Sequence, residues 1–123
     1  MNKEIVENLI KNDYLKEKIS IIDKLIEKED FKEAYFKLAV ILEYLNIKYI
    51  KHKYNLDMPN SSVINIINTY IDKDNKLYKE MVTINGEYNQ VDTNDITMDD
   101  IEYLAGMVDS IYFYMLQDEG EFI

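Results

Sequence analysis

Hydrophobic residues recur at helical spacing, every three or four positions, along most of the chain. The first half contains two long stripes of this kind. One runs through residues 3–28 and is broken only by the polar pair Asn12-Asp13, while the other follows the capping-box sequence Asp30-Phe31-Lys32-Glu33. We therefore predict a first helix over roughly 3–28, kinked near Asn12 with Asp13 as a fresh N-cap, and a second helix over about 31–54.

Three shorter patterns follow in the second half. Residues 61–71 and 77–88 carry helical stripes, and Thr97-Met98-Asp99-Asp100 can cap a last helix. The inner face of that helix would comprise Ile101, Leu104, Val108, Ile111 and Met115. The acidic tail after Gln117 is expected to fray. Because no stretch alternates with period two for long enough to be a strand, we predict one all-α domain over 1–123, an up-and-down bundle of about five helices.

Composition supports the all-α class and indicates where in the cell the protein is expected. The 123 residues include 47% hydrophobic residues but only three Gly and one Pro, which favours long helices over many turns. The absence of Cys excludes disulfides, thiolate metal sites and cysteine nucleophiles. Acidic residues appear at once at the N-terminus, and no apolar run is long enough for a signal segment or a membrane span. We expect a cytoplasmic protein with no membrane association.

Charge divides the chain into two unequal halves. Residues 1–54 have a net charge of +1, whereas residues 55–123 have a net charge of −11, and every basic residue except His52 is a lysine. Such a field attracts basic partners and repels nucleic acid. The acids that crowd around the start of the last helix are the expected contacts for a basic protein partner: Asp92, Asp95, Asp99, Asp100 and Glu102. Their spacing does not match a calcium-binding loop, so we predict neither a metal nor a cofactor.

The one locally basic stretch lies at the end of the second helix. Lys48, Lys51, His52 and Lys53 are interleaved there with tyrosines, a pattern that could contact phosphates, although it also suits the carbonyl end of a helix dipole. His52 is the only imidazole, and no nucleophile is placed beside it in the sequence. We therefore predict no catalytic residue.

The last helix is unusually rich in aromatic residues. Tyr103, Tyr112 and Tyr114 fall partly off its predicted inner face, so another part of the molecule must cover them. A second copy of the chain would do so in a homodimer. The first helix could do so equally well if it wraps far enough round the bundle.

The order of these features resembles the HEPN superfamily (higher eukaryotes and prokaryotes nucleotide-binding domain). The resemblance rests on an early helix with an Ala- and aromatic-rich stripe, Phe31-Lys32-Glu33-Ala34-Tyr35-Phe36-Lys37-Leu38, followed by a polar segment and a last amphipathic helix. It implies a small, often dimeric helical bundle, in whose active members an Arg and a His in the polar segment form a ribonuclease site. In this chain Asn85 stands at the Arg position and Gln90 at the His position. The resemblance thus implies a member without ribonuclease activity.

Together these observations favour a non-enzymatic interaction or regulatory module that binds a basic protein through its acidic C-terminal half. The same charge also suits a small acidic inhibitor that mimics nucleic acid and occupies a nucleic-acid channel. A third interpretation is a residual RNA or nucleotide binder built around His52 and its neighbouring lysines.

Overall fold

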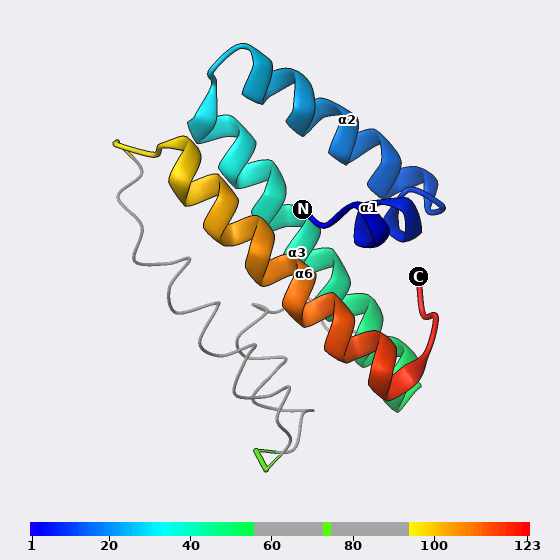
Figure 1. Ribbon diagram of the computed structural model, residues 1–123. Helices are drawn as coiled ribbons and strands as arrows, with labels where there is room; N and C mark the ends of the chain where they lie inside the picture. The colour runs from blue at the N-terminus through cyan, green and yellow to red at the C-terminus, as the bar shows by residue number, and fades with distance from the viewer. Residues whose placement is uncertain (56–72, 75–93) are drawn as a thin grey trace.

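The computed structural model describes residues 1–55, 73–74 and 94–123 (Figure 1). These residues form four α-helices and contain no β-strand, which confirms the all-α class for this part of the chain. The helices expected at 61–71 and 77–88 lie outside the described residues, so the expected number of five stays a prediction. In chain order the helices are α1 (Lys3–Leu9), α2 (Asp13–Glu27), α3 (Phe31–Tyr54) and α6 (Met98–Glu119).

The polar break in the first stripe separates α1 from α2. Its cap is Asn12 rather than the predicted Asp13, because the Asn12 side-chain oxygen accepts a hydrogen bond from the main-chain N–H of Leu15 at 3.1 Å. The Asn12 amide also donates to the hydroxyl of Tyr44 on α3 at 3.1 Å, which ties the break to the next helix. Asp13 becomes the first helical residue, where its negative charge complements the helix dipole.

Helix α3 begins and ends where the sequence predicts. Asp30 is its N-cap, and its carboxylate accepts from the N–H of Glu33 at 3.4 Å. Asn55 ends the helix in the left-handed conformation, with φ of 51°, which asparagine tolerates better than most residues. Of the lysines expected to complement the dipole in the last turns, Lys51 and Lys53 lie in the last turn, together with the imidazole of His52.

Helix α3 is the central element, and α2 and α6 both pack against it (Figure 1). Helix α2 runs antiparallel to α3 across a short turn, whereas α6 runs in the same direction as α3. A strictly alternating order of five helices would run α3 and α6 in opposite directions, so the up-and-down prediction is not met for this pair. The parallel arrangement places the basic C-terminal end of α3 beside the acidic C-terminal end of α6, where the lysines of α3 offset both the carbonyl ends and the acids of α6.

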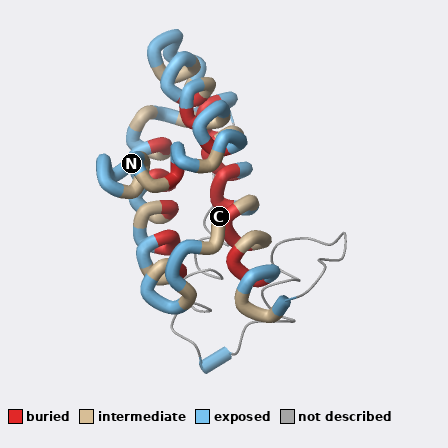
Figure 2. Tube along the Cα trace, turned by 90° about the vertical axis from the view of Figure 1, so that its right-hand side faces the viewer, coloured by how far each residue is buried: buried red, intermediate tan, exposed pale blue. Residues whose placement is uncertain are grey.

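The core forms where the predicted stripes meet. The buried residues lie on the sides of the helices that face one another (Figure 2), and α3 contributes more of them than any other described helix. The predicted inner face of the last helix is buried throughout: Ile101, Leu104, Val108, Ile111 and Met115. In the first two stripes the fully or nearly fully buried residues include Leu9, Leu15, Ile19, Ile22, Leu38, Leu42, Leu45 and Tyr49.

The residues after Gln117, which were expected to fray, are packed against the rest of the fold. Helix α6 continues to Glu119, and beyond it the ring of Phe122 packs edge-on against Tyr49 and Tyr112, with a centroid separation of 5.8 Å in each case. An apolar anchor at Phe122 therefore holds the acidic tail on the core. None of the helices in the described part of the chain is both long and apolar enough to cross a membrane.

Candidate partner-binding groove

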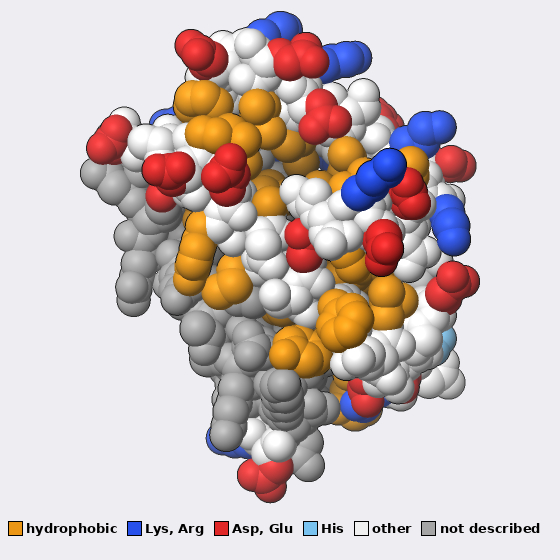
Figure 3. Space-filling view, viewed as in Figure 1, with side chains coloured by type: hydrophobic (Ala, Val, Ile, Leu, Met, Phe, Trp, Pro, Cys, Tyr) orange, Lys and Arg blue, Asp and Glu red, His pale blue; other side chains and the backbone are white. Residues whose placement is uncertain are grey.

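A groove of about 280 Å³ opens between α2 and the first three turns of α6, with α3 behind it. Figure 3 shows hydrophobic side chains gathered on this face, with acidic side chains around them. We call it the α2–α6 groove. Ile22 and Ile26 from α2, Leu38 from α3, and Ile101 and Ala105 from α6 supply its apolar surface. Such a hollow with a polar rim is the kind of surface that marks an interaction site.

The charged side chains that line the groove are all acidic. Asp23 comes from α2, and Glu102 and Asp109 come from α6, so both walls carry negative charge. The described lining contains no basic side chain. Gly106 also lines the groove, and a Cβ added to it would meet no atom within 4 Å, so the wall of α6 is open at this position.

Asp109 marks the far end of the groove along α6. One of its carboxylate oxygens accepts a hydrogen bond from the main-chain N–H of Asn2 at 2.7 Å, which fixes the N-terminal segment beside α6. The other oxygen is buried and has no hydrogen-bond partner among the described residues. A buried carboxylate oxygen without a donor is costly, so the negative charge of Asp109 favours a cation at this end of the groove.

The acids predicted for partner binding occupy different environments. Glu102 lines the groove, and Asp95 and Asp99 are exposed near the start of α6. Asp100 acts within the fold, because its carboxylate accepts from the N–H of Thr97 at 2.8 Å and from the Thr97 hydroxyl at 3.2 Å. Asp92 lies outside the described residues.

Two groove acids, Asp23 and Asp109, were missed by the sequence reasoning. The available signal was that each lies at the edge of an apolar stripe, next to the buried residues Ile22 and Val108 respectively. Asp23 was also overlooked because it belongs to the half of the chain whose net charge is close to zero. The net charge of each half of the chain thus indicated the acids on the α6 wall of the groove but gave no sign of Asp23 on the α2 wall.

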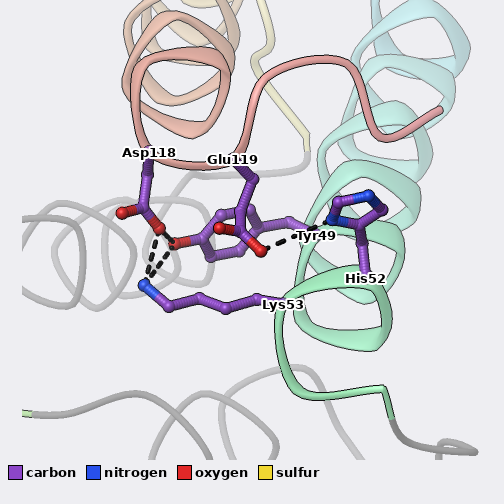
Figure 4. Close-up of polar contacts among 5 residues, drawn as sticks. All are labelled: Tyr49, His52, Lys53, Asp118 and Glu119. Atoms are coloured by element: carbon purple, nitrogen blue, oxygen red, sulfur yellow. Dashed lines mark hydrogen bonds and ion pairs between the residues drawn. The ribbon is translucent and has the colours of Figure 1, made fainter.

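The opposite end of the bundle holds a cluster that we call the C-terminal clasp, made of Tyr49, His52, Lys53, Asp118 and Glu119 (Figure 4). The Tyr49 hydroxyl donates to the carboxylate of Asp118. The Lys53 ammonium lies 2.6 Å from the same carboxylate and 3.2 Å from the Tyr49 hydroxyl. His52 Nδ1 lies 3.4 Å from a carboxylate oxygen of Glu119, which makes an ion pair when the imidazole is protonated.

Electrostatics in the clasp follow from these contacts. Burial, the hydrogen bond to Asp118 and that carboxylate's charge all raise the pKa of Tyr49. Burial opposes the charged forms of Lys53 and Asp118, but their mutual contact outweighs it, so the pKa of Lys53 is raised and the pKa of Asp118 is lowered. The clasp therefore keeps the Tyr49 phenol neutral and keeps Lys53 and Asp118 charged. This arrangement favours stability rather than proton transfer.

The clasp accounts for half of the predicted phosphate-contact patch. Lys53 and His52 face carboxylates of α6, and Lys48 lies over the ring of Tyr44 at 5.5 Å from its centroid. Lys51 is exposed. Because acids lie directly against Lys53 and His52, this end of α3 is a weaker phosphate site than the sequence suggested.

The three tyrosines of the last helix do not share one environment. Tyr112 is fully buried and packs against Phe122, so it is unavailable as a dimer contact and the prediction for it is corrected. Tyr103 is 55% exposed. Tyr114 is half-buried and lines a second hollow with Ile5, so α1 covers part of this face.

The remaining candidate residues and the comparisons add no further assignment. Asn85 and Gln90 lie outside the described residues. Within the part of the chain that is described, no three His, Asp or Glu side chains are grouped as metal ligands. Comparison of the chain with family models, with curated proteins and with solved structures finds no match.

Proposed function

We propose that this chain is a non-enzymatic interaction module that binds a basic protein partner through its acidic C-terminal half. The observation that carries the proposal is the α2–α6 groove, which combines an apolar surface with carboxylates on both walls. Apolar contact supplies affinity, while the carboxylates favour basic partners and speed their approach. The HEPN-like, ribonuclease-inactive interpretation is part of the proposal and rests on the absence of arginine and on Asn85 and Gln90 in the sequence.

The experiment is affinity capture from the native host at low salt, followed by identification of the bound protein and titration of its binding. Three acids of the C-terminal half are changed together, as Asp95→Asn, Asp99→Asn and Glu102→Gln. Asp100 is left intact because its carboxylate accepts from the main-chain N–H of the N-cap Thr97 and so completes the capping box of α6. We expect the triple variant to bind the captured partner more weakly and with a smaller dependence on salt, because surface charges act mainly through screened attraction.

A matched control removes three negative charges elsewhere. Glu17, Glu27 and Glu43 are exposed acids on α2 and α3, outside the described lining of the groove, and are changed together to Gln. The control should retain most of the affinity. If partner binding is insensitive to salt, or if the two triple variants bind equally, the acidic half is not the binding surface.

A further inference from the structure

We infer that the α2–α6 groove binds a basic amphipathic α-helix of the partner, an inference that rests on the proposed function and specifies its ligand. The groove follows α6 from Met98 to Asp109, which is about three helical turns or roughly 17 Å. Its volume of about 280 Å³ suits a few inserted side chains better than a whole drug-sized ligand. The occupant is therefore a polypeptide surface that projects a short apolar stripe.

The positions of the acids favour a helix over an extended strand. Asp23 and Glu102 lie on opposite walls, so negative charge flanks the apolar surface on both sides. In a basic amphipathic helix, lysines or arginines border an apolar stripe on both sides, about 100° away around the axis. In a strand, successive side chains point to opposite faces, so residues next to an apolar anchor point away from the groove. Only the helix places cations against both walls at once.

Two further features of α6 fit this occupant. Ala105 and Gly106 give the wall a low profile, which allows the backbone of another helix to come close. The carboxylate of Asp109 stands at the end of the track, where its negative charge favours a lysine at the end of the bound helix. This is the helix-in-groove mode of peptide recognition, here with acids in the positions that select basic sequences.

The test uses a fluorescein-labelled synthetic peptide of about fourteen residues, with a leucine stripe bordered by lysines on both sides. Its affinity for the full chain is measured by fluorescence anisotropy at several salt concentrations. A peptide of the same composition in scrambled order, without a stripe, measures attraction due to charge alone. We expect the striped peptide to bind more tightly than the scrambled one.

The decisive variant is Gly106→Leu, which fills the groove without changing the charge. Its side chain has room to form, and leucine is a better helix former than glycine, so the variant should fold with unchanged or higher thermal stability. We expect it to weaken binding of the striped peptide about tenfold or more, because excluding one leucine-sized anchor has an effect of that order. Binding of the scrambled peptide should not change.

Charge variants give an independent readout. Asp23→Asn with Glu102→Gln should weaken the striped peptide and reduce its salt dependence, whereas Glu17→Gln with Glu43→Gln should have little effect. Equal binding of the striped peptide to the wild-type chain and to Gly106→Leu would overturn the groove assignment. If the captured partner binds weakly to the triple acid variant but binds normally to Gly106→Leu, the proposed function stands. In that case only the inference about the groove fails.

Discussion

The C-terminal clasp provides a quantitative test, because two buried tyrosines in contact with the same Phe122 differ in their hydroxyl environment. Both Tyr49 and Tyr112 are fully buried. The Tyr49 hydroxyl donates to the Asp118 carboxylate, whereas the Tyr112 hydroxyl has no hydrogen-bond partner among the described residues. Replacing each with phenylalanine removes one oxygen and leaves the ring. The substitution should therefore lower the free energy of unfolding at Tyr49 and leave it unchanged or raise it at Tyr112.

The expected magnitude for Tyr49→Phe follows from the charge of its acceptor. A hydrogen bond to a charged group contributes about 1.5–3 kcal/mol. Asp118 is 37% exposed and keeps its contact with Lys53, so the lower end applies. We expect a loss of about 1.5 kcal/mol, which lowers the thermal midpoint by roughly 6 °C in a chain of this size. Tyr112→Phe should be neutral or stabilising by up to about 1 kcal/mol, because it removes a buried hydroxyl that lacks a partner.

The measurements are chemical and thermal unfolding followed by circular dichroism. Tyr14→Phe is a further control, because Tyr14 is 42% exposed and its hydroxyl has no hydrogen bond within the described part of the chain. Its effect should stay within about 0.5 kcal/mol. If Tyr49→Phe costs no more than Tyr14→Phe, or if Tyr112→Phe is the more damaging of the two buried changes, the reasoning about these hydroxyls is refuted.

The same two hydroxyls predict how stability depends on alkaline pH. Burial raises the pKa of Tyr112 to about 12, with a smaller contribution from the charge of Glu121, and the pKa of Tyr49 is also raised. Since both folded-state values exceed the unfolded value of about 10, their contribution is complete below that pH and is lost as the pH rises above it. Each tyrosine can cost up to about 1.4 kcal/mol per pH unit in this range. Either phenylalanine variant should therefore lose stability less steeply than the wild type above pH of about 10.

Other sites give simpler predictions. Asp30→Ala should lower the free energy of unfolding by about 1 kcal/mol in chemical denaturation, because it removes the cap of α3, and an unchanged midpoint would contradict that role. Asn46 is fully buried with neither amide atom bonded among the described residues, so Asn46→Leu should stabilise by about 1–3 kcal/mol; destabilisation would reveal a partner. Tyr103 is 55% exposed, so Tyr103→Ala should weaken self-association in light scattering, and equal masses for the variant and the wild type would remove Tyr103 from a dimer interface.

Much of the described fold could be predicted from local sequence. The spacing of apolar residues and the caps at Asp30 and Thr97 gave the bounds of α3 and the start of α6, because these signals act within one or two helical turns. The error in the predicted cap of α2, Asp13 instead of Asn12, is also local, because it amounts to one residue. Two adjacent residues can each cap a helix, and the choice depends on Tyr44, a distant residue that bonds to Asn12.

The clasp and the groove could not be predicted in this way, because they depend on the register between helices. Tyr49 and Asp118 are 69 positions apart, and nothing in the spacing of either stripe indicates that α3 and α6 run in parallel. One local anomaly was nevertheless available. Asp118 and Glu119 lie in the last turn of α6, where the helix dipole disfavours acids, and no basic residue accompanies them there. Such a conflict indicates that a basic partner is supplied from elsewhere, and here Lys53 pairs with Asp118 while the imidazole of His52 lies beside Glu119.

The central position of α3 has a consequence for synthesis of the chain. Its partner α2 precedes it directly, so this pair can form as soon as α3 emerges from the ribosome. Its partner α6 begins only at Met98, so the apolar positions that α6 covers lack this partner until α6 has been synthesised. A nascent or truncated chain would thus display a hydrophobic strip suited to chaperones and would lack the α6 wall of the groove. Binding in the groove would then require that α6 has already been made and has packed on α3.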